Sequence, residues 1–244
     1  MMILPSITRF PSGVNNAALG SIFNNLPFPD TSNFHIYDQD FDQFVAADWT
    51  VTETQAGATQ ALVAGDGGLL ALVNSAANND VNQVQKTPAA FLLAAGKSAF
   101  MKFRAKVDDA TLAAFAIGLQ NVNADGTVLA NALDGMFFLK PAAATSLNVY
   151  CRKDNTTGSN SAAAIASMAN DTFIDMSLYY DAGNGNPTNG ARLYYGINGT
   201  VLGYLNASST YFPDAILSPV AVVKNGSGAA RTATIDQMYI AVER

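Results

Sequence analysis

The stretch ARLYYGINGTVLGYL, residues 191–205, carries the strongest local fold signal in the chain. Its Asn198-Gly199 pair lies between two runs that are rich in β-branched, aromatic and other apolar residues. A two-residue type I′ turn needs positive φ angles at both central positions, and Asn and Gly adopt such angles most readily. We therefore expect a tight antiparallel hairpin at this point.

Short runs of alternating residues continue on both sides of this hairpin. Three of them are FMKFRAKV (100–107), SLNVYCRK (146–153) and FIDMSLYYD (173–181). The side chains expected to face the core are Met101, Phe103, Ala105 and Val107, then Leu147, Val149 and Cys151, then Ile174, Met176, Leu178 and Tyr180. The last run, TIDQMYIAV (234–242), is largely apolar on both faces and is expected to be central. With Gly, Asn and Asp clusters between the runs, this pattern predicts an all-β fold, an antiparallel β-sandwich of the jelly-roll type.

Three Ala-rich or Leu-rich segments allow a helical alternative, because both residues favour helix. PAAFLLAAGK (88–97) and SAAAIASMAN (161–170) are compatible with either a strand or a short helix. DDATLAAFAIGL (108–119) follows a strand directly and is expected to be mostly strand.

Residues 1–36 differ in character from the rest of the chain. Four prolines and several isolated apolar residues occur there without a period of 2 or 3.6, which indicates an extended N-terminal arm ahead of a sandwich domain at 37–244. Its large apolar residues need to be covered. The candidate partner-binding residues are Ile22, Phe23, Phe28 and Phe34. We expect no signal peptide and no membrane-spanning segment.

The surface is expected to be largely neutral. Only 13% of the residues are charged and the net charge is −6, whereas about 25% are charged in typical soluble domains. Depletion of Lys and Glu is typical of surfaces that partner proteins cover, although a composition without functional meaning explains it equally well. The acidic balance argues against nucleic-acid binding, and a single cysteine excludes an internal disulfide.

The stretch YDQDFDQFVAADWT, residues 37–50, places aspartates at positions 38, 40 and 42. An EF-hand loop starting there would need Gly and Glu where Gln43 and Trp49 stand. We therefore expect the entry to the sandwich, with the aspartates outward, Tyr37 and Phe41 inward, and Trp49 in the core. An irregular cation site on the three carboxylates, or a calcium loop in DAGNGNPTNG (181–190), stays as an alternative.

Residues for catalysis are scarce. Glu53 and Glu243 are the only glutamates and lie near opposite ends of the chain, whereas a glycoside hydrolase needs two carboxylates roughly 5 to 10 Å apart. A Cys-His dyad would have to join Cys151 to His35, and one His plus one Cys cannot form a zinc site. We predict no enzyme activity, no metal and no cofactor.

Five stretches of the chain are informative when taken together: YDQDFDQFVAADWTVTETQAG, GDGGLLALVNSAANNDVNQVQ, KSAFMKFRAKVDDATLAAFAIGLQN, DGMFFLK and the closing IDQMYIAVE. Their succession resembles tailed-bacteriophage virion proteins with a concanavalin A-like or laminin G-like jelly roll. The resemblance covers roughly residues 37–244. It implies a structural decoration, or cement, protein that binds the outer surface of the phage capsid and bridges capsomers. It also implies the major capsid protein as partner, a homo-oligomer such as a trimer, and a location on the outside of the virion.

The same fold also occurs in glycan-binding modules. The alternative function is therefore a carbohydrate-binding head fibre or adhesin, with surface glycans as partners. Tyr194, Tyr195 and Tyr204 are its candidate sugar-contacting aromatics, together with the 181–190 loop.

Overall fold

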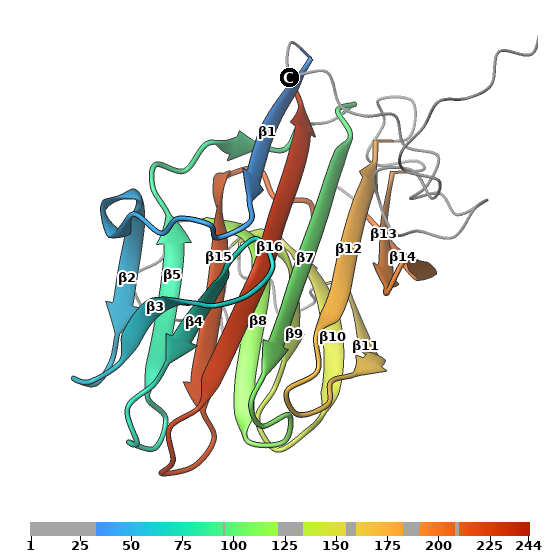
Figure 1. The fold of residues 1–244 in the computed structure, drawn as a ribbon. Helices are drawn as coiled ribbons and strands as arrows, with labels where there is room; N and C mark the ends of the chain where they lie inside the picture. Colours follow the sequence, from blue (N-terminus) through green and yellow to red (C-terminus); the bar gives the residue numbers. More distant parts are fainter. Residues whose placement is uncertain (1–32, 95, 122–133, 155–159, 183–190, 208–209) are drawn as a thin grey trace, which may run out of the picture.

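The computed structural model describes residues 33–94, 96–121, 134–154, 160–182, 191–207 and 210–244. These residues form two antiparallel eight-stranded sheets that pack face to face (Figure 1). Sheet A contains, in spatial order, β14 (Thr200–Asn206), β13 (Arg192–Ile197), β12 (Ile174–Asp181), β7 (Ala99–Val107), β16 (Thr232–Glu243), β4 (Leu69–Val73) and β3 (Thr59–Val63), and β1 (Phe34–Gln39) also pairs with β16. Sheet B contains β11 (Asn160–Ser167), β10 (Ser146–Arg152), β9 (Gly135–Lys140), β8 (Ala113–Asn121), β15 (Ile216–Asn225), β5 (Val81–Lys86) and β2 (Trp49–Glu53), and β6 (Phe91–Leu92) pairs with β15.

The predicted hairpin is confirmed. Strands β13 and β14 pair on either side of Asn198 and Gly199, which have φ angles of 49° and 77°. Both angles are positive, as a type I′ turn requires. The hairpin forms one edge of sheet A.

The core lies between the two sheets, and the alternating runs supply it as expected. The inward residues of β7, β10 and β12 are all at most 6% exposed. Strand β16 is central, but its register shifts between Ile235 and Gln237 against β7. This bulge directs Ile235 and Met238 into the core, so the strict alternation expected for the last strand does not hold.

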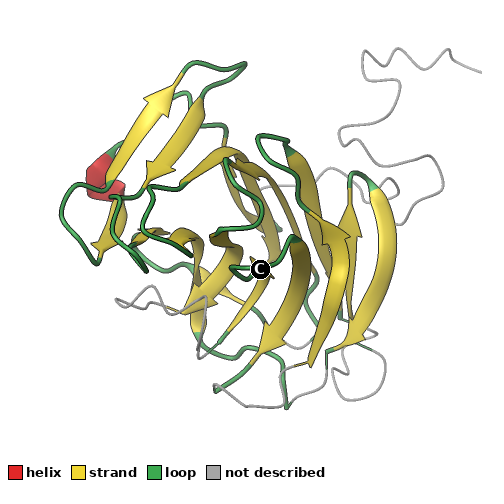
Figure 2. Ribbon diagram, turned by 90° about the horizontal axis from the view of Figure 1, so that it is seen from below, coloured by secondary structure: helices red, strands yellow, loops and turns green. Residues whose placement is uncertain are grey.

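The helical alternatives do not form. Residues 88–97 contain the short strand β6, 161–170 contain most of β11, and 108–119 lead into β8. Among the described residues the one helical segment is the 3-10 turn η1 (Ala46–Asp48), drawn red in Figure 2. Pairing with neighbouring strands therefore overrides the helix propensity of Ala and Leu. No helix in the described ranges is long and apolar enough to span a membrane.

The aspartate-rich stretch is the entry to the sandwich. Strand β1 begins at Phe34 and ends at Gln39, and the chain then turns at Phe41, which has a φ of 52° and is fully buried. Trp49 is 8% exposed and its ring packs against Phe41 at 6.2 Å between centroids. The expected boundary between arm and sandwich is not tested, because residues 1–32 lie outside the described part of the chain.

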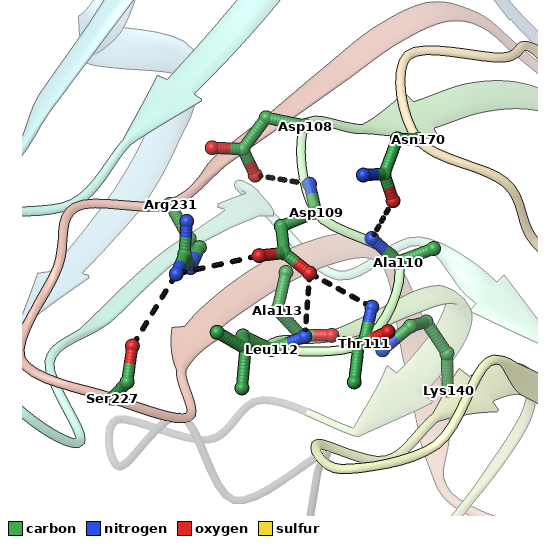
Figure 3. Close-up of polar contacts among 10 residues, drawn as sticks. All are labelled: Asp108, Asp109, Ala110, Thr111, Leu112, Ala113, Lys140, Asn170, Ser227 and Arg231. Carbon is green, nitrogen blue, oxygen red and sulfur yellow. Dashed lines mark hydrogen bonds and ion pairs between the residues drawn. The ribbon is translucent and has the colours of Figure 1, made fainter.

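A partly exposed polar network lies in the turn between β7 and β8 (Figure 3). Asp109 Oδ1 accepts hydrogen bonds from the amides of Thr111 at 2.9 Å and Leu112 at 2.8 Å, and Arg231 Nη2 lies 3.4 Å from Asp109 Oδ2. The bond from Leu112 contributes most to lowering the pKa of Asp109. Beside it, the fully buried Lys140 donates from Nζ to the carbonyl oxygens of Ala113 and Pro141.

Candidate ligand-binding face

The outer face of sheet A carries a line of aromatic side chains. Phe100 of β7 lies opposite Tyr179 of β12, Tyr179 opposite Tyr194 of β13, and Tyr194 opposite Tyr204 of β14. We call these four residues the aromatic row. Adjacent strands are about 4.8 Å apart, so the row runs across the strands with one ring on each. Tyr239 of β16 lies beside Phe100, with ring centroids 6.1 Å apart.

The three tyrosine rings of the row contact one another in succession. Tyr179 and Tyr194 stack with centroids 6.2 Å apart and an interplanar angle of 21°, and Tyr194 and Tyr204 lie 5.7 Å apart at 54°. Tyr204 is 47% exposed, and the others are half-buried. Burial, followed by the Asp181 carboxylate, raises the pKa of Tyr179. Its phenol therefore stays protonated near neutral pH and can donate a hydrogen bond.

Charged groups flank the row. The Arg192 guanidinium lies 4.5 Å from the Tyr204 ring centroid, a cation–π contact at the outer end of the row. Arg104 binds two carboxylates, with Nη1 3.1 Å from Asp175 and Nε 2.5 Å from Asp236. This pairing offsets one of the two negative charges in the central part of the face.

Two of the three candidate sugar-contacting tyrosines lie on the outer face of sheet A. Tyr194 and Tyr204 belong to the aromatic row, whereas Tyr195 packs against the core. A Cβ on Gly203 would lie only 2.5 Å from the Tyr195 hydroxyl, so the ring covers this glycine. The alternation of Tyr195 with Leu193 and Ile197 was the signal that could have predicted its inward direction.

The other residues of the sequence-based hypotheses are placed only in part. Ile22, Phe23 and Phe28 lie outside the described residues, as do positions 183–190 of the Asn-rich loop. Phe34 is the first residue of β1, half-buried and opposite Glu243. No contact of Phe34 tests its expected partner-binding role.

The candidate nucleophile and base are engaged in separate contacts. Cys151 is fully buried and its Sγ donates to the Tyr211 carbonyl at 3.2 Å, and burial raises the pKa of the thiol to about 12. His35 stacks on Phe91 at 4.4 Å, and its Nδ1 lies 3.1 Å from the Ala90 carbonyl oxygen. Neither arrangement provides an activated nucleophile.

The two glutamates lie on different sheets. Glu53 ends β2 in sheet B, whereas Glu243 ends β16 in sheet A. Asp40 follows β1, and burial together with Asp236, Asp38 and other carboxylates raises its pKa. The side chains of Asp38, Asp40 and Asp42 are nevertheless mostly exposed, as expected for an acidic turn.

One acidic group was not foreseen from the sequence. Asp134, Asp154 and Asp214 bring carboxylate oxygens within 4.8 Å of one another, a geometry that could hold a cation. Burial raises the pKa of Asp134, and Lys153 forms an ion pair with Asp214. The ammonium group of Lys153 already supplies positive charge there. The three positions are far apart in the sequence, so no local pattern announced them.

Comparison with known proteins identifies the fold. No family model and no curated protein matches the chain. An endo-1,3-β-glucanase from Streptomyces sioyaensis superposes with a TM-score of 0.61 at 12% identity, covering 89% of this chain and 99% of the other. The Emp47p carbohydrate recognition domain superposes with a TM-score of 0.58 at 13% identity, covering 87% of this chain and 98% of that domain. A Bacteroides ovatus GH16 protein of a mixed-linkage glucan locus, in complex with a product, superposes with a TM-score of 0.56 at 11% identity. This match covers 84% of this chain and 99% of the other. The chain thus has the jelly-roll sandwich of lectins and glucanases, as expected.

Proposed function

We propose that this protein is a non-catalytic carbohydrate-binding module that holds a glycan chain along the aromatic row. The observation that carries this proposal is the direct cross-strand register of Phe100, Tyr179, Tyr194 and Tyr204 on an outer sheet face. Each ring of the row is at least partly exposed, and a contiguous apolar patch on a protein surface marks an interaction site.

The chemistry of the row suits a sugar chain. Pyranose rings present C–H groups that pack on aromatic rings and hydroxyl groups that bond to phenols and guanidinium groups. Tyrosine offers both an apolar body and a polar tip. Neighbouring tyrosine rings of the row have centroids 5.7 to 6.2 Å apart, so successive sugars of an extended chain would contact successive rings.

The fold is compatible with this role, since several proteins of the same architecture are named for carbohydrate recognition or glucan hydrolysis. Absence of turnover is part of the proposal. It is supported by the location of Glu53 and Glu243 on different sheets. It is supported further by Arg104, which binds both Asp175 and Asp236 on the candidate face.

Calorimetry with soluble β-glucans and their oligosaccharides tests the proposal. Tyr194→Ala and Tyr204→Ala should each weaken binding about tenfold or more, because aromatic anchors of a binding site typically contribute about 1.4 kcal/mol or more. Tyr150→Ala is the matched control, since Tyr150 is half-buried on the outer side of sheet B. Equal loss in all three variants, or no binding of any glycan on an array, would refute the proposal. Release of reducing sugar from these glycans would refute its non-catalytic part.

A second candidate is a structural virion protein that decorates the outer surface of a phage capsid. Leu92 of β6 and Ile216 of β15 are register partners, 53% and 54% exposed, and form an apolar pair on a surface with few charges. Such a pair favours contact with another protein. Repeated weak contacts by an oligomer, such as a trimer on the major capsid protein, would combine through avidity.

Mixing the protein with purified empty heads tests this candidate. Co-sedimentation that is lost in a Leu92→Asp, Ile216→Asp variant but kept in Tyr194→Ala would favour decoration. Failure to bind heads would refute the capsid role. If deletion of residues 1–32 leaves head binding unchanged, the N-terminal arm takes no part in that binding.

A further inference from the structure

Lys102 places a positive charge beside the aromatic row. It lies on the same face of β7 as Phe100, two positions further along the strand, and is therefore about 7 Å from the row. Its register partners are Ser177 of β12 and Tyr239 of β16, both uncharged. In the part of the chain that the structure describes, no ion pair or hydrogen bond engages its ammonium group.

The other two cations on this face of β7 are already paired. Arg104 binds two carboxylates, and Lys106 Nζ lies 3.5 Å from the Asp171 carboxylate. Both cations are also farther from the row, since Arg104 follows Lys102 by two more positions along the strand. Lys102 is thus the cation of β7 that a ligand on the row would reach first.

A second cation lies on the other side of the row. Arg192 of β13 is the register partner of Asp181 in β12. Lys102 is the partner of Ser177 in the same strand. Because Tyr179 lies between these two positions of β12, the two cations flank the row from opposite sides. The Asp181 carboxylate offsets part of the charge on the Arg192 side, so Lys102 attracts an anion more strongly.

The tyrosines around Lys102 do not repel an anion. Burial, followed by the Asp181 carboxylate, raises the pKa of Tyr179, and burial, followed by Asp38, raises the pKa of Tyr239. Both phenols therefore stay neutral near neutral pH and can donate hydrogen bonds. Phenol donors beside an ammonium group suit an oxygen anion, because charge-assisted hydrogen bonds are about twice as strong as neutral ones.

We propose that the glycan held by the aromatic row is acidic, with a carboxylate or sulfate group on its sugars that contacts Lys102. This inference rests on the proposed function, because it assigns the chemical class of the ligand for the same face. The apolar faces of the sugars pack on the rings, and the acidic group extends sideways along β7 to the Lys102 ammonium group. The flexible four-carbon stem of lysine can cover the distance of two strand positions.

Calorimetry with matched oligosaccharides tests the proposal. The probes are a neutral glucose oligosaccharide, the same oligosaccharide oxidised to carboxylates at C6, and its sulfate ester at C6. At low salt at least one acidic form should bind about tenfold tighter than the neutral form, and added salt should reduce this preference. The acidic form that binds more tightly identifies the group that Lys102 contacts.

Variants of Lys102 assign the preference to this residue. Lys102→Met should bind the neutral and acidic forms alike, and Lys102→Glu should bind the acidic forms more weakly than the neutral one. Lys224→Met is the matched control, since Lys224 is half-buried on β15 in sheet B and also forms no ion pair with a described residue. It removes the same charge and should keep the acidic preference. Thermal unfolding of each variant shows that it is folded.

Three results would overturn the proposal. Equal binding of the neutral and acidic forms by the unmodified protein would overturn it and leave the proposed function intact. An acidic preference that persists in Lys102→Met, or that Lys224→Met loses to the same extent, would show that Lys102 does not contact the ligand. If none of the oligosaccharides binds, the proposed function itself fails and the acidic assignment fails with it.

Discussion

Replacing Lys140 by Met should change how stability depends on pH. Lys140 is fully buried at the end of β9, where its Nζ donates to the carbonyl oxygens of Ala113 and Pro141. Figure 3 shows Lys140 beside Ala113. Burial lowers its pKa from 10.5 to about 8, although Asp109 acts in the opposite direction. A neutral amine still has two N–H groups, so it can bond to both carbonyls without carrying a buried charge.

The size of the effect follows from the pKa. Each tenfold change in proton affinity is worth about 1.4 kcal/mol, so the lowered pKa means that the charged lysine destabilises the fold by about 3 kcal/mol below pH 8. Between about pH 8 and 10.5 the unfolded chain keeps this proton while the folded chain has lost it. Stability rises with pH wherever the unfolded state binds more protons. The unmodified protein should therefore gain about 3 kcal/mol relative to Lys140→Met across this window.

Urea denaturation followed by the fluorescence of Trp49, the single tryptophan, measures the difference. Loss of these hydrogen bonds in Lys140→Met changes the free energy of unfolding by the same amount at every pH, so it does not alter the pH dependence. Tyr180 and Cys151, whose pKa values burial raises to about 12, are common to both proteins. Lys153→Met is the control, because a hydrogen bond to Asp214 raises the pKa of Lys153 and places its titration above this window. A stability difference for Lys140→Met that stays flat from pH 7 to 10.5 would refute the reasoning.

Two further predictions concern the core and its entry. Gly68→Ala should destabilise the protein by about 2 kcal/mol or more, because Gly68 has a φ of 120° and a Cβ there would overlap the Phe41 carbonyl. Gly57 has a φ of 102°, but a Cβ there would have no atom nearer than 3.8 Å. Gly57→Ala should therefore lose less stability in urea denaturation, and an equal loss would contradict the steric argument. Cys151 should resist alkylation in the native protein, because its pKa is raised to about 12 by burial. Mass spectrometry should show labelling only on unfolding, and rapid labelling of the native protein would contradict this.

Local patterns predicted most of the fold. Alternation in 100–107, 146–153 and 173–181 depends only on the direction of successive side chains in a strand, and burial of their inward faces confirms it. The turn at Asn198-Gly199 was predictable because its backbone angles are chemically restricted. The bulge between Ile235 and Gln237 was not predictable, because it depends on the pairing of β16 with β7.

The candidate ligand-binding face was predictable only in part. Tyr194 and Tyr204 could be related to each other, because a tight hairpin fixes the register of its two strands. Phe100 and Tyr179 join them through the pairing of β7 with β12, two strands separated by more than sixty positions. No local pattern encodes such a register, and the same limit hid the group of Asp134, Asp154 and Asp214.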